Sequence, residues 1–176
     1  LVALRSLPDA LGEVLQSRPK IADAARTFAT SRRYWTVVGN GPNAVAAEEV
    51  RIKLSELCYK SIACDITEDK KHIDLSCEPL IFVCAAGLSG GTATDVAKEI
   101  EIYRAHKALP IVVATIGEQR FTAAAAVIEV PVVDPRVAFV LSVMVGHLFG
   151  YEAALAIDAL ARPLRQTREV VEHAVE

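Results

Sequence analysis

Two continuous apolar runs constrain the fold of this chain more than any other feature of its sequence. The run "LIFVCAA" begins at Leu80, and the run "PIVVAT" begins at Pro110. Each has the length of a strand and no polar alternation, which is the pattern of a strand buried on both faces. Such strands occur almost only in parallel sheets covered by helices on both sides. These two segments therefore predict an α/β fold.

The remaining segments supply the alternation that a parallel sheet requires. Further strands are expected at "YWTVV", "KSIAC" and "AAVIEVP", with helices over residues 8–31, 44–57, 93–106 and 136–158. This order predicts a Rossmann-like, three-layer α/β/α sandwich with a parallel sheet of about five strands. Apolar residues at the strand centres should form its core: Val37, Val38, Phe82, Val83, Val112, Val113 and Ile128.

Composition narrows the classes of partner. A chain of 176 residues that is 52% hydrophobic can bury a substantial core, and its net charge of −3 gives no reason to expect nucleic acid or an anionic membrane as a partner. The longest apolar segment, residues 137–157, contains His147 and Glu152, so we expect a core helix instead of a membrane span. His147 itself is expected to be a hydrogen-bonded core histidine.

The cysteines and histidines show no metal-binding spacing, so no metal site is expected. A reduced, cytoplasmic location is the expectation for four cysteines without C-x-x-C spacing: Cys58, Cys64, Cys77 and Cys84. The chain begins at Leu1 and its only methionine is Met144, which suggests a piece of a longer protein.

Two glycine-rich loops follow predicted strands and open helices. The first, residues 39–44, fits the G-x-G-x-x-A fingerprint of dinucleotide binding, with Asp65 ending the next strand, although glycines in a tight turn give the same pattern. The second runs from Gly87 to Thr92. Its glycines allow an anion to approach the backbone at a helix N-terminus, where Ser89 adds a hydroxyl. An ordinary helix cap explains this loop equally well.

A charged ladder lies on the helix expected over residues 44–57. Glu49, Lys53 and Glu56 are spaced by four and three residues, which stacks them on one helical face beside the apolar stripe. Such a ladder is either a solvated surface feature or the acid–base apparatus of a site. If it is a site, Glu56 should point with Lys53 into a cleft near the carboxyl end of a strand.

The order of these parts resembles the SIS (sugar isomerase) domain family, and more narrowly the second SIS lobe of the glutamine–fructose-6-phosphate aminotransferases. The resemblance covers nearly the whole chain and is carried by "VVGNGPNAVAAEEVRIKLSELCY", "SGGTATD", "EDKKH" and the tail "ARPLRQTREVVEHAVE". It implies a helical lead-in over residues 1–33, an SIS domain over 34–160 and a C-terminal tail over 161–176.

The resemblance also implies roles for individual residues. Glu56 takes the position of the family's proton-shuttling carboxylate, Lys53 that of the lysine beside it, and His72 that of the ring-opening histidine, which the neighbouring subunit supplies. Arg168 falls where the family has its Schiff-base lysine, and a guanidinium cannot form that imine. Substrate and phosphate would contact the two glycine-rich loops through Gly39, Gly41, Ser89, Gly90, Gly91 and Thr92.

The implied activity is conversion of fructose 6-phosphate and glutamine to glucosamine 6-phosphate, without a cofactor. The implied partners are a sugar phosphate, a second copy in a homodimer and a preceding SIS lobe in a longer chain. Two alternatives stay open at this point. One is a non-catalytic, phosphosugar-binding regulatory module, which Arg168 favours; the other is a nucleotide-binding α/β domain.

Overall fold

The computed structural model of the chain describes residues 2–70, 75–160 and 162–175. Its elements in chain order are α1 (Val2–Arg5), α2 (Leu7–Gln16), α3 (Arg18–Phe28), η1 (Ala29–Ser31), β1 (Trp35–Gly39), α4 (Pro42–Cys58), β2 (Ala63–Asp65), α5 (Thr67–Lys70), η2 (Leu75–Cys77), β3 (Leu80–Ala85), α6 (Gly90–Ala105), β4 (Leu109–Thr115), β5 (Ala126–Val130), α7 (Phe139–Leu160) and α8 (Arg162–Val175).

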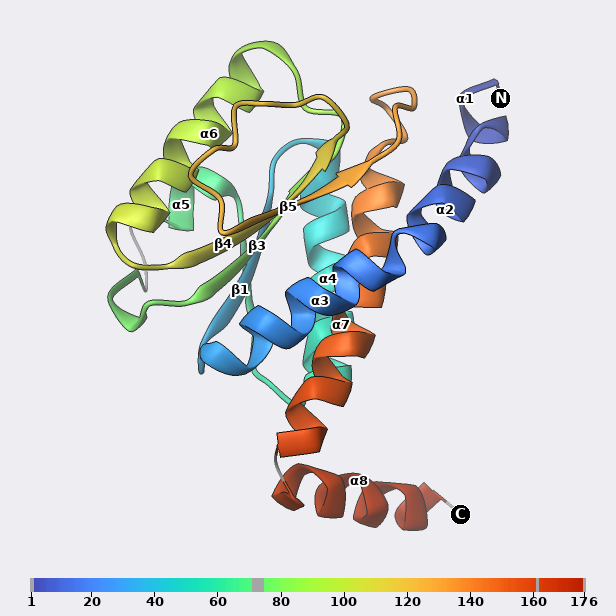
Figure 1. Cartoon of the computed structure of the whole chain (residues 1–176), viewed down its shortest axis with the longest axis vertical. Coiled ribbons are helices and arrows are strands. Elements are labelled where there is room, and N and C mark those ends of the chain that lie inside the picture. The colour runs from blue at the N-terminus through green and yellow to red at the C-terminus, as the bar shows by residue number, and fades with distance from the viewer. Residues whose placement is uncertain (1, 71–74, 161, 176) are drawn as a thin grey trace.

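The five strands form one parallel sheet in the order β2-β1-β3-β4-β5. Helices α3, α4 and α7 cover one face, and α5 and α6 cover the other (Figure 1). The predicted α/β/α sandwich with a parallel sheet is therefore confirmed. Because every strand points the same way, the loops after β1, β3 and β4 gather at one edge, which we call the carboxyl edge.

The core consists of two apolar clusters, one on each face of the sheet. On the α4–α7 face, Phe149 contacts the rings of Trp35 and Phe82, with centroids 6.5 and 5.3 Å apart. The residues predicted to lie in the core are all buried, and they alternate between the two clusters as successive strand residues must: Val37, Phe82, Val113 and Ile128 on one face, and Val38, Val83 and Val112 on the other.

The helical segment before the sheet shares this core. The helix expected over residues 8–31 is interrupted at Ser17, and Pro19 lies in the first turn of α3, where a missing amide costs no helical hydrogen bond. Ile21 and Ala25 on α3 are fully buried in the cluster that contains α7. The lead-in is thus packed into the same layer as α4 and α7.

Helix α7 packs directly against α4, because two of its glycines face that helix. A Cβ atom on Gly146 would lie 2.3 Å from Val50, and one on Gly150 would lie 2.9 Å from Leu54. By length and composition the stretch Phe139–Ile157 could cross a membrane, but half of it is buried within this fold. Here α7 is a central helix of the layer between α3 and α4 (Figure 1).

Candidate functional site

The loop after β1 is a closed turn. A Cβ atom on Gly39 would lie 2.1 Å from the backbone oxygen of Asn43, and Gly41 has a φ of +56°, so glycine is required at both positions. Pro42 then begins α4 at a position where proline is favoured. The glycines of this motif are explained by the path of the backbone.

The two asparagines of the same loop tie the carboxyl edge together. Asn40 exchanges two hydrogen bonds with Thr67, through its Nδ2 (2.7 Å) and its Oδ1 (3.1 Å). The buried Asn43 donates to the carbonyl of Ala86 (2.8 Å) and accepts from Ser142 Oγ (2.9 Å). Sequence reasoning passed over both side chains, although a polar residue next to glycines at the end of a buried strand could have indicated them.

The loop after β3 presents the first turn of α6 to solvent. Ser89 is the N-cap residue but makes no capping hydrogen bond, and Gly90 has a φ of +55°. Ser89, Gly90, Gly91 and Thr92 are all exposed. The opening amides of a helix have no partner within it and carry a positive partial charge, so this turn can bind a phosphate through backbone and hydroxyl groups.

A charge pair that was not predicted flanks this turn. Arg120, from the loop after β4, donates through Nη1 to the carbonyl of Gly90 (2.8 Å) and to Thr94 Oγ1 (3.3 Å), and its Nε and Nη2 donate to Glu118. The hydrogen bonds from Arg120 hold the pKa of Glu118 below its usual range. The pair therefore joins the β4–β5 loop to the start of α6.

The charged ladder lies at the other end of α4. Lys53 Nζ lies 2.8 Å from Glu56 Oε2, and the hydrogen bond and charge of Glu56 raise the pKa of Lys53, with a smaller contribution from Glu49. Glu56 is fourteen residues beyond Pro42, about 20 Å along the helix axis at ~1.5 Å per residue. Its side chain is 59% exposed. The prediction that Glu56 enters a cleft beside the carboxyl end of a strand is therefore wrong, because helix α4 carries it to the opposite end.

His147 differs from its expected place as well. Its ring Nε2 lies 3.0 Å from Glu49 Oε1, and the side chain is 36% exposed. The predicted hydrogen bond is present, but the residue lies at the surface of the α4–α7 pair instead of in the core. The close approach of α7 to α4 at Gly146 brings the two side chains within reach.

Helix α8 (Arg162–Val175), in the C-terminal tail, contacts the end of α4 beside the ladder. Arg168 on α8 donates through Nη2 to the carbonyl of Leu57 (2.9 Å), and its guanidinium lies 5.7 Å from the centroid of the Tyr59 ring. Leu57 follows Glu56 directly, so the residue at the Schiff-base position lies beside the ladder. Tyr59 ends α4 in the left-handed conformation, and Arg168 satisfies one of the last carbonyls of the helix.

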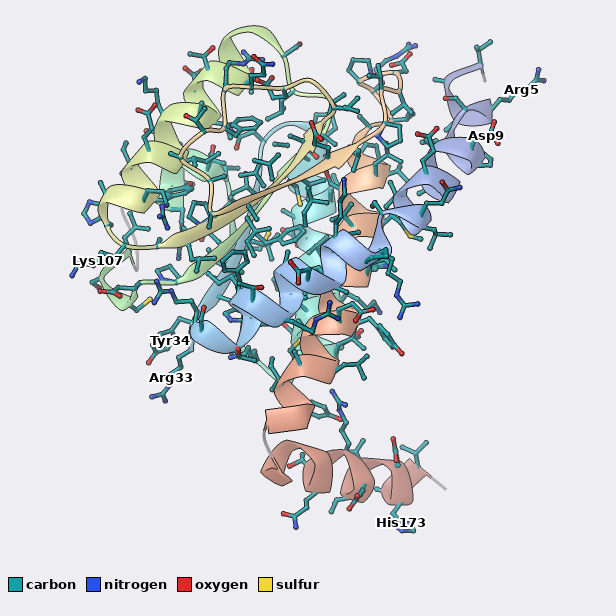
Figure 2. All side chains as sticks on the ribbon, viewed as in Figure 1. Arg5, Asp9, Arg33, Tyr34, Lys107 and His173 are labelled. Atoms are coloured by element: carbon teal, nitrogen blue, oxygen red, sulfur yellow. The ribbon has the colours of Figure 1, made fainter. Side chains whose placement is uncertain are left out.

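Within the described parts of the chain, no other histidine lies at the Ser89–Thr92 turn or at the ladder. His72 lies outside the described residues. His106 is exposed at the C-cap of α6, and His173 lies near the end of α8, away from the sheet (Figure 2). No group of three or more His, Cys, Asp or Glu residues that could hold a metal occurs within residues 2–70, 75–160 and 162–175.

Cys58, Cys64 and Cys84 are poor nucleophiles in this setting. Burial raises the pKa of Cys58 to about 12 and that of Cys64 to about 11, and it raises the pKa of the fully buried Cys84 further. Because the thiolate is the reactive form, these thiols are inert near neutral pH.

Two cavities lie away from both polar regions. One of about 310 Å³ separates α3 from β5 and contains Lys20 and Val127. Another of about 430 Å³ lies at the amino-terminal end of the sheet and contains Trp35 and Lys70. Neither of these two cavities is lined by a predicted site residue.

Comparison with known proteins finds relatives of one kind of enzyme. No family model matches the chain. It is 31% identical over 170 residues, 95% of its length, to the glutamine–fructose-6-phosphate aminotransferase [isomerizing] of Thermus thermophilus, and 28% identical over 173 residues to that of Methanosarcina mazei. The chain spans 27% and 28% of the length of these two relatives, about a quarter.

Solved structures share the fold at lower sequence identity. The C-terminal domain of glucosamine-fructose-6-phosphate aminotransferase from Francisella tularensis aligns with a TM-score of 0.76 at 16% identity, covering 87% of this chain and 43% of that one. Tagatose-6-phosphate ketose/aldose isomerase from Escherichia coli gives 0.70 at 21% identity, with the same coverage. The sugar isomerase domain of an RpiR transcription factor from Sphaerobacter thermophilus gives 0.70 at 15% identity and covers 97% of this chain and 96% of that one.

Proposed function

We propose that this chain, an SIS domain related to the glutamine–fructose-6-phosphate aminotransferases, is a sugar-phosphate-binding lobe of an enzyme of that kind. The observation that carries the proposal is the exposed, glycine-rich turn at Ser89–Thr92, which opens α6 after a buried strand. Its free amides and two hydroxyls suit a phosphate group. The relatives act on sugar phosphates according to their names, which supports this ligand class.

The sugar on which the ladder would act differs from the sugar bound at the Ser89–Thr92 turn. Fructose 6-phosphate has six carbons and is far shorter than the separation of about 20 Å along α4 between Pro42 and Glu56. One molecule therefore cannot contact both the Ser89–Thr92 turn and Glu56. The ladder would work on a sugar held against it by a preceding SIS lobe or a second copy, which would also cover its exposed side chains.

Within such an assembly the ladder suits proton transfer between C1 and C2. Glu56 as a carboxylate would take a proton from C1 of the aminated sugar and return it at C2, so that no net proton is lost. Lys53 Nζ, which lies 2.8 Å from Glu56 Oε2, can hold that carboxylate in position through its hydrogen bond. His72 retains its proposed ring-opening role by resemblance alone.

Binding of sugar phosphates to the chain tests the first part of the proposal. Calorimetric titration with fructose 6-phosphate, glucosamine 6-phosphate, inorganic phosphate and NAD should show binding of the sugar phosphates and none of NAD. Binding of NAD in preference to the sugar phosphates would instead support a dinucleotide site at Gly39–Asn43.

Arg168 favours a second candidate function, a phosphosugar-binding regulatory module. Its guanidinium is engaged with the carbonyl of Leu57 and the ring of Tyr59, a structural role that a Schiff-base lysine would not fill in the same way. Activity of the longest natural form of the protein, compared with its Arg168→Lys variant, separates the two functions. Turnover that appears only in Arg168→Lys would identify a binding module, and turnover in the natural protein would support the enzyme.

A further inference from the structure

Strand β5 is an open side of the sheet. It is the last strand in the order β2-β1-β3-β4-β5 and pairs with β4 alone among the described strands, so alternate backbone N–H and C=O groups point outward from it. The strand on the opposite side, β2, has only three residues, and a very short strand offers little to pair with. β5 has five residues, three of them β-branched, contains no proline or lysine and pairs with β4 without a bulge. It is therefore the side of the sheet that can accept a further strand.

Two cavities follow β5 and share Glu129, and we call them together the β5 groove. The first is the cavity of about 310 Å³ between α3 and β5, and four consecutive residues, 126–129, line it. Because successive side chains of a strand point to opposite faces, a cavity lined by consecutive residues lies along the outer side of the strand and not on one face. The second cavity, of about 350 Å³, continues past Glu129 to Val132 and is bounded by Glu13 of α2. Helices α2 and α3 pass beside β5 and contribute one wall of the groove (Figure 1).

The second cavity is acidic. Glu13 and Glu129 come from different elements, yet both line it, and among the described residues neither has an ion-pair partner. Glu129 accepts a long hydrogen bond from the amide of Gly117 (3.5 Å). The other lining residues are apolar, and Ile116 and Val132 among them are exposed. Two carboxylates beside apolar groups suit a lysine or arginine, whose aliphatic stem packs on apolar surface while its charged head pairs with the carboxylates.

The first cavity suits a different side chain. Its two charged residues from α3, Lys20 and Asp23, are opposite in sign, and the apolar Ala24, Phe28 and Ile128 also line it. An apolar side chain is the better fit to this part of the groove. The groove therefore offers an apolar cavity toward the start of β5 and an acidic cavity toward its end.

We propose that the β5 groove binds an extended segment of a partner protein, which adds to β5 as a further strand and places an apolar side chain in the first cavity and a lysine or arginine in the second. In this mode of recognition, backbone hydrogen bonds to the open strand supply affinity, and cavities for alternate side chains supply specificity. A second copy of this chain is the less suitable occupant, because β5 carries no basic residue to place in the acidic cavity. The inference is independent of the proposed sugar-phosphate function.

The test titrates the longest natural form of the protein with short fluorescent peptides. Each has one leucine and one arginine on a threonine background, two or four positions apart so that both side chains lie on the same face of a strand, in either order because an added strand runs parallel or antiparallel to β5. We expect at least one arrangement to bind with a micromolar Kd and to slow amide hydrogen exchange over residues 126–130. Methylation of alternate peptide amides should abolish binding, because the peptide then cannot pair with β5.

Side-chain variants test the acidic cavity. Glu13→Gln and Glu129→Gln should each weaken binding of the arginine peptide by about 1.5–5-fold at low salt, as expected for an exposed ion pair. Glu13→Lys combined with Glu129→Lys should reverse the preference, so that a peptide with glutamate in place of arginine binds more tightly. Both positions are exposed, so the variants should fold. Glu101→Gln, which changes an exposed carboxylate on α6, is the control and should leave the affinity unchanged.

Three results would overturn the inference. They are the absence of peptide binding at about 1 mM, binding that survives methylation of alternate amides, and a preference for arginine that survives the two lysine substitutions. Self-association of the chain that slows exchange over residues 126–130 without any peptide would assign the groove to a second copy and would also overturn it. Each of these results leaves the proposed sugar-phosphate function in place, because that function uses the turn at Ser89–Thr92.

Discussion

The carboxyl edge and the α4–α7 face hold their polar groups in different ways. At the edge, the asparagine side chains are consumed in binding the loops to one another, and Asn43 is 2% exposed. The surface that remains for a ligand is backbone amide and hydroxyl at the start of α6. On the α4–α7 face the charged side chains pair mainly with each other, and they stay one-third to more than one-half exposed.

The two arrangements determine which groups each region can offer a ligand. A turn stiffened by buried hydrogen bonds presents its amides in a fixed array, which suits recognition of an anion. A pair of helices presents groups that can gain and lose protons, but it encloses nothing by itself. These are the grounds on which we propose a binding site for the first region and, for the second, half of an active site that another surface would complete.

Glu56→Gln should have the largest effect, a loss of turnover on the α4–α7 face without a loss of binding at the carboxyl edge. In the longest natural form of the protein, loss of a positioned base should lower turnover by about 10²–10⁴-fold, while binding of fructose 6-phosphate at the edge stays unchanged. Steady-state kinetics and calorimetry measure the two quantities. Glu101→Gln is the matched control, because Lys98 and Glu101 form the same kind of exposed i,i+3 pair on α6 at 2.9 Å. Equal turnover in both variants would reduce the ladder to a solvated surface feature.

Ser89→Ala should have the converse effect, weaker binding at the carboxyl edge without a loss of turnover. Loss of one hydroxyl bond to a charged phosphate should weaken binding by roughly 1.5–3 kcal/mol, or about 10–150-fold. The ladder lies at the far end of α4, so kcat at saturating substrate should not change. Ser31→Ala, which removes an exposed hydroxyl far from the edge, is the control. An unchanged affinity in Ser89→Ala would remove the phosphate from this turn.

Gly146→Ala should lower the stability of the fold by disturbing the packing of α7 against α4. The new Cβ would lie 2.3 Å from the fully buried Val50, and such overpacking typically costs about 1–3 kcal/mol. Urea denaturation measures the loss. Gly12→Ala on α2 meets nothing within 4 Å, and alanine in a helix should leave stability equal or slightly higher. If Gly146→Ala proves as stable as Gly12→Ala, α7 does not contact α4 at position 146.

Acid should produce the smallest effect, at Glu118. The hydrogen bonds from Arg120 depress the pKa of this carboxyl in the folded protein. A depressed pKa contributes stability above the ordinary carboxyl pKa, and that contribution is lost as the pH falls through the lower, folded value. The natural protein should melt above Glu118→Gln at pH 7, and the gap in Tm should close below about pH 4.5. A gap that widens with acid would contradict the pairing.

Sequence reasoning reached the fold more completely than the site, for physical reasons. Doubly buried strands leave a strong local pattern, so β3, β4 and the sheet core could be predicted from the residues themselves. Spacing also showed correctly that Lys53 and Glu56 meet. The position of Glu56 relative to the sheet depends on the length and direction of α4, which no local pattern contains.

The missed contacts join segments that lie far apart in the chain. His147 and Glu49 are 98 residues apart, and Arg120 reaches Gly90 across 30. A histidine in an apolar run resembles a core residue until the partner helix is placed beside it. The glycines at 146 and 150 were the available signal, because small residues one turn apart often mark the close packing of two helices.

The two-sided engagement of Asn43 has a consequence for how the sequence can vary. Its amide donates to Ala86 and its oxygen accepts from Ser142, in a space where the side chain is 2% exposed. Aspartate could not donate to the carbonyl, and glutamine would need room for another methylene. Among natural variants of this chain we therefore expect asparagine to persist at position 43 even in lineages where Lys53, Glu56 or position 168 drifts. A collection of close variants in which position 43 changes freely would show that the three elements can be joined without it.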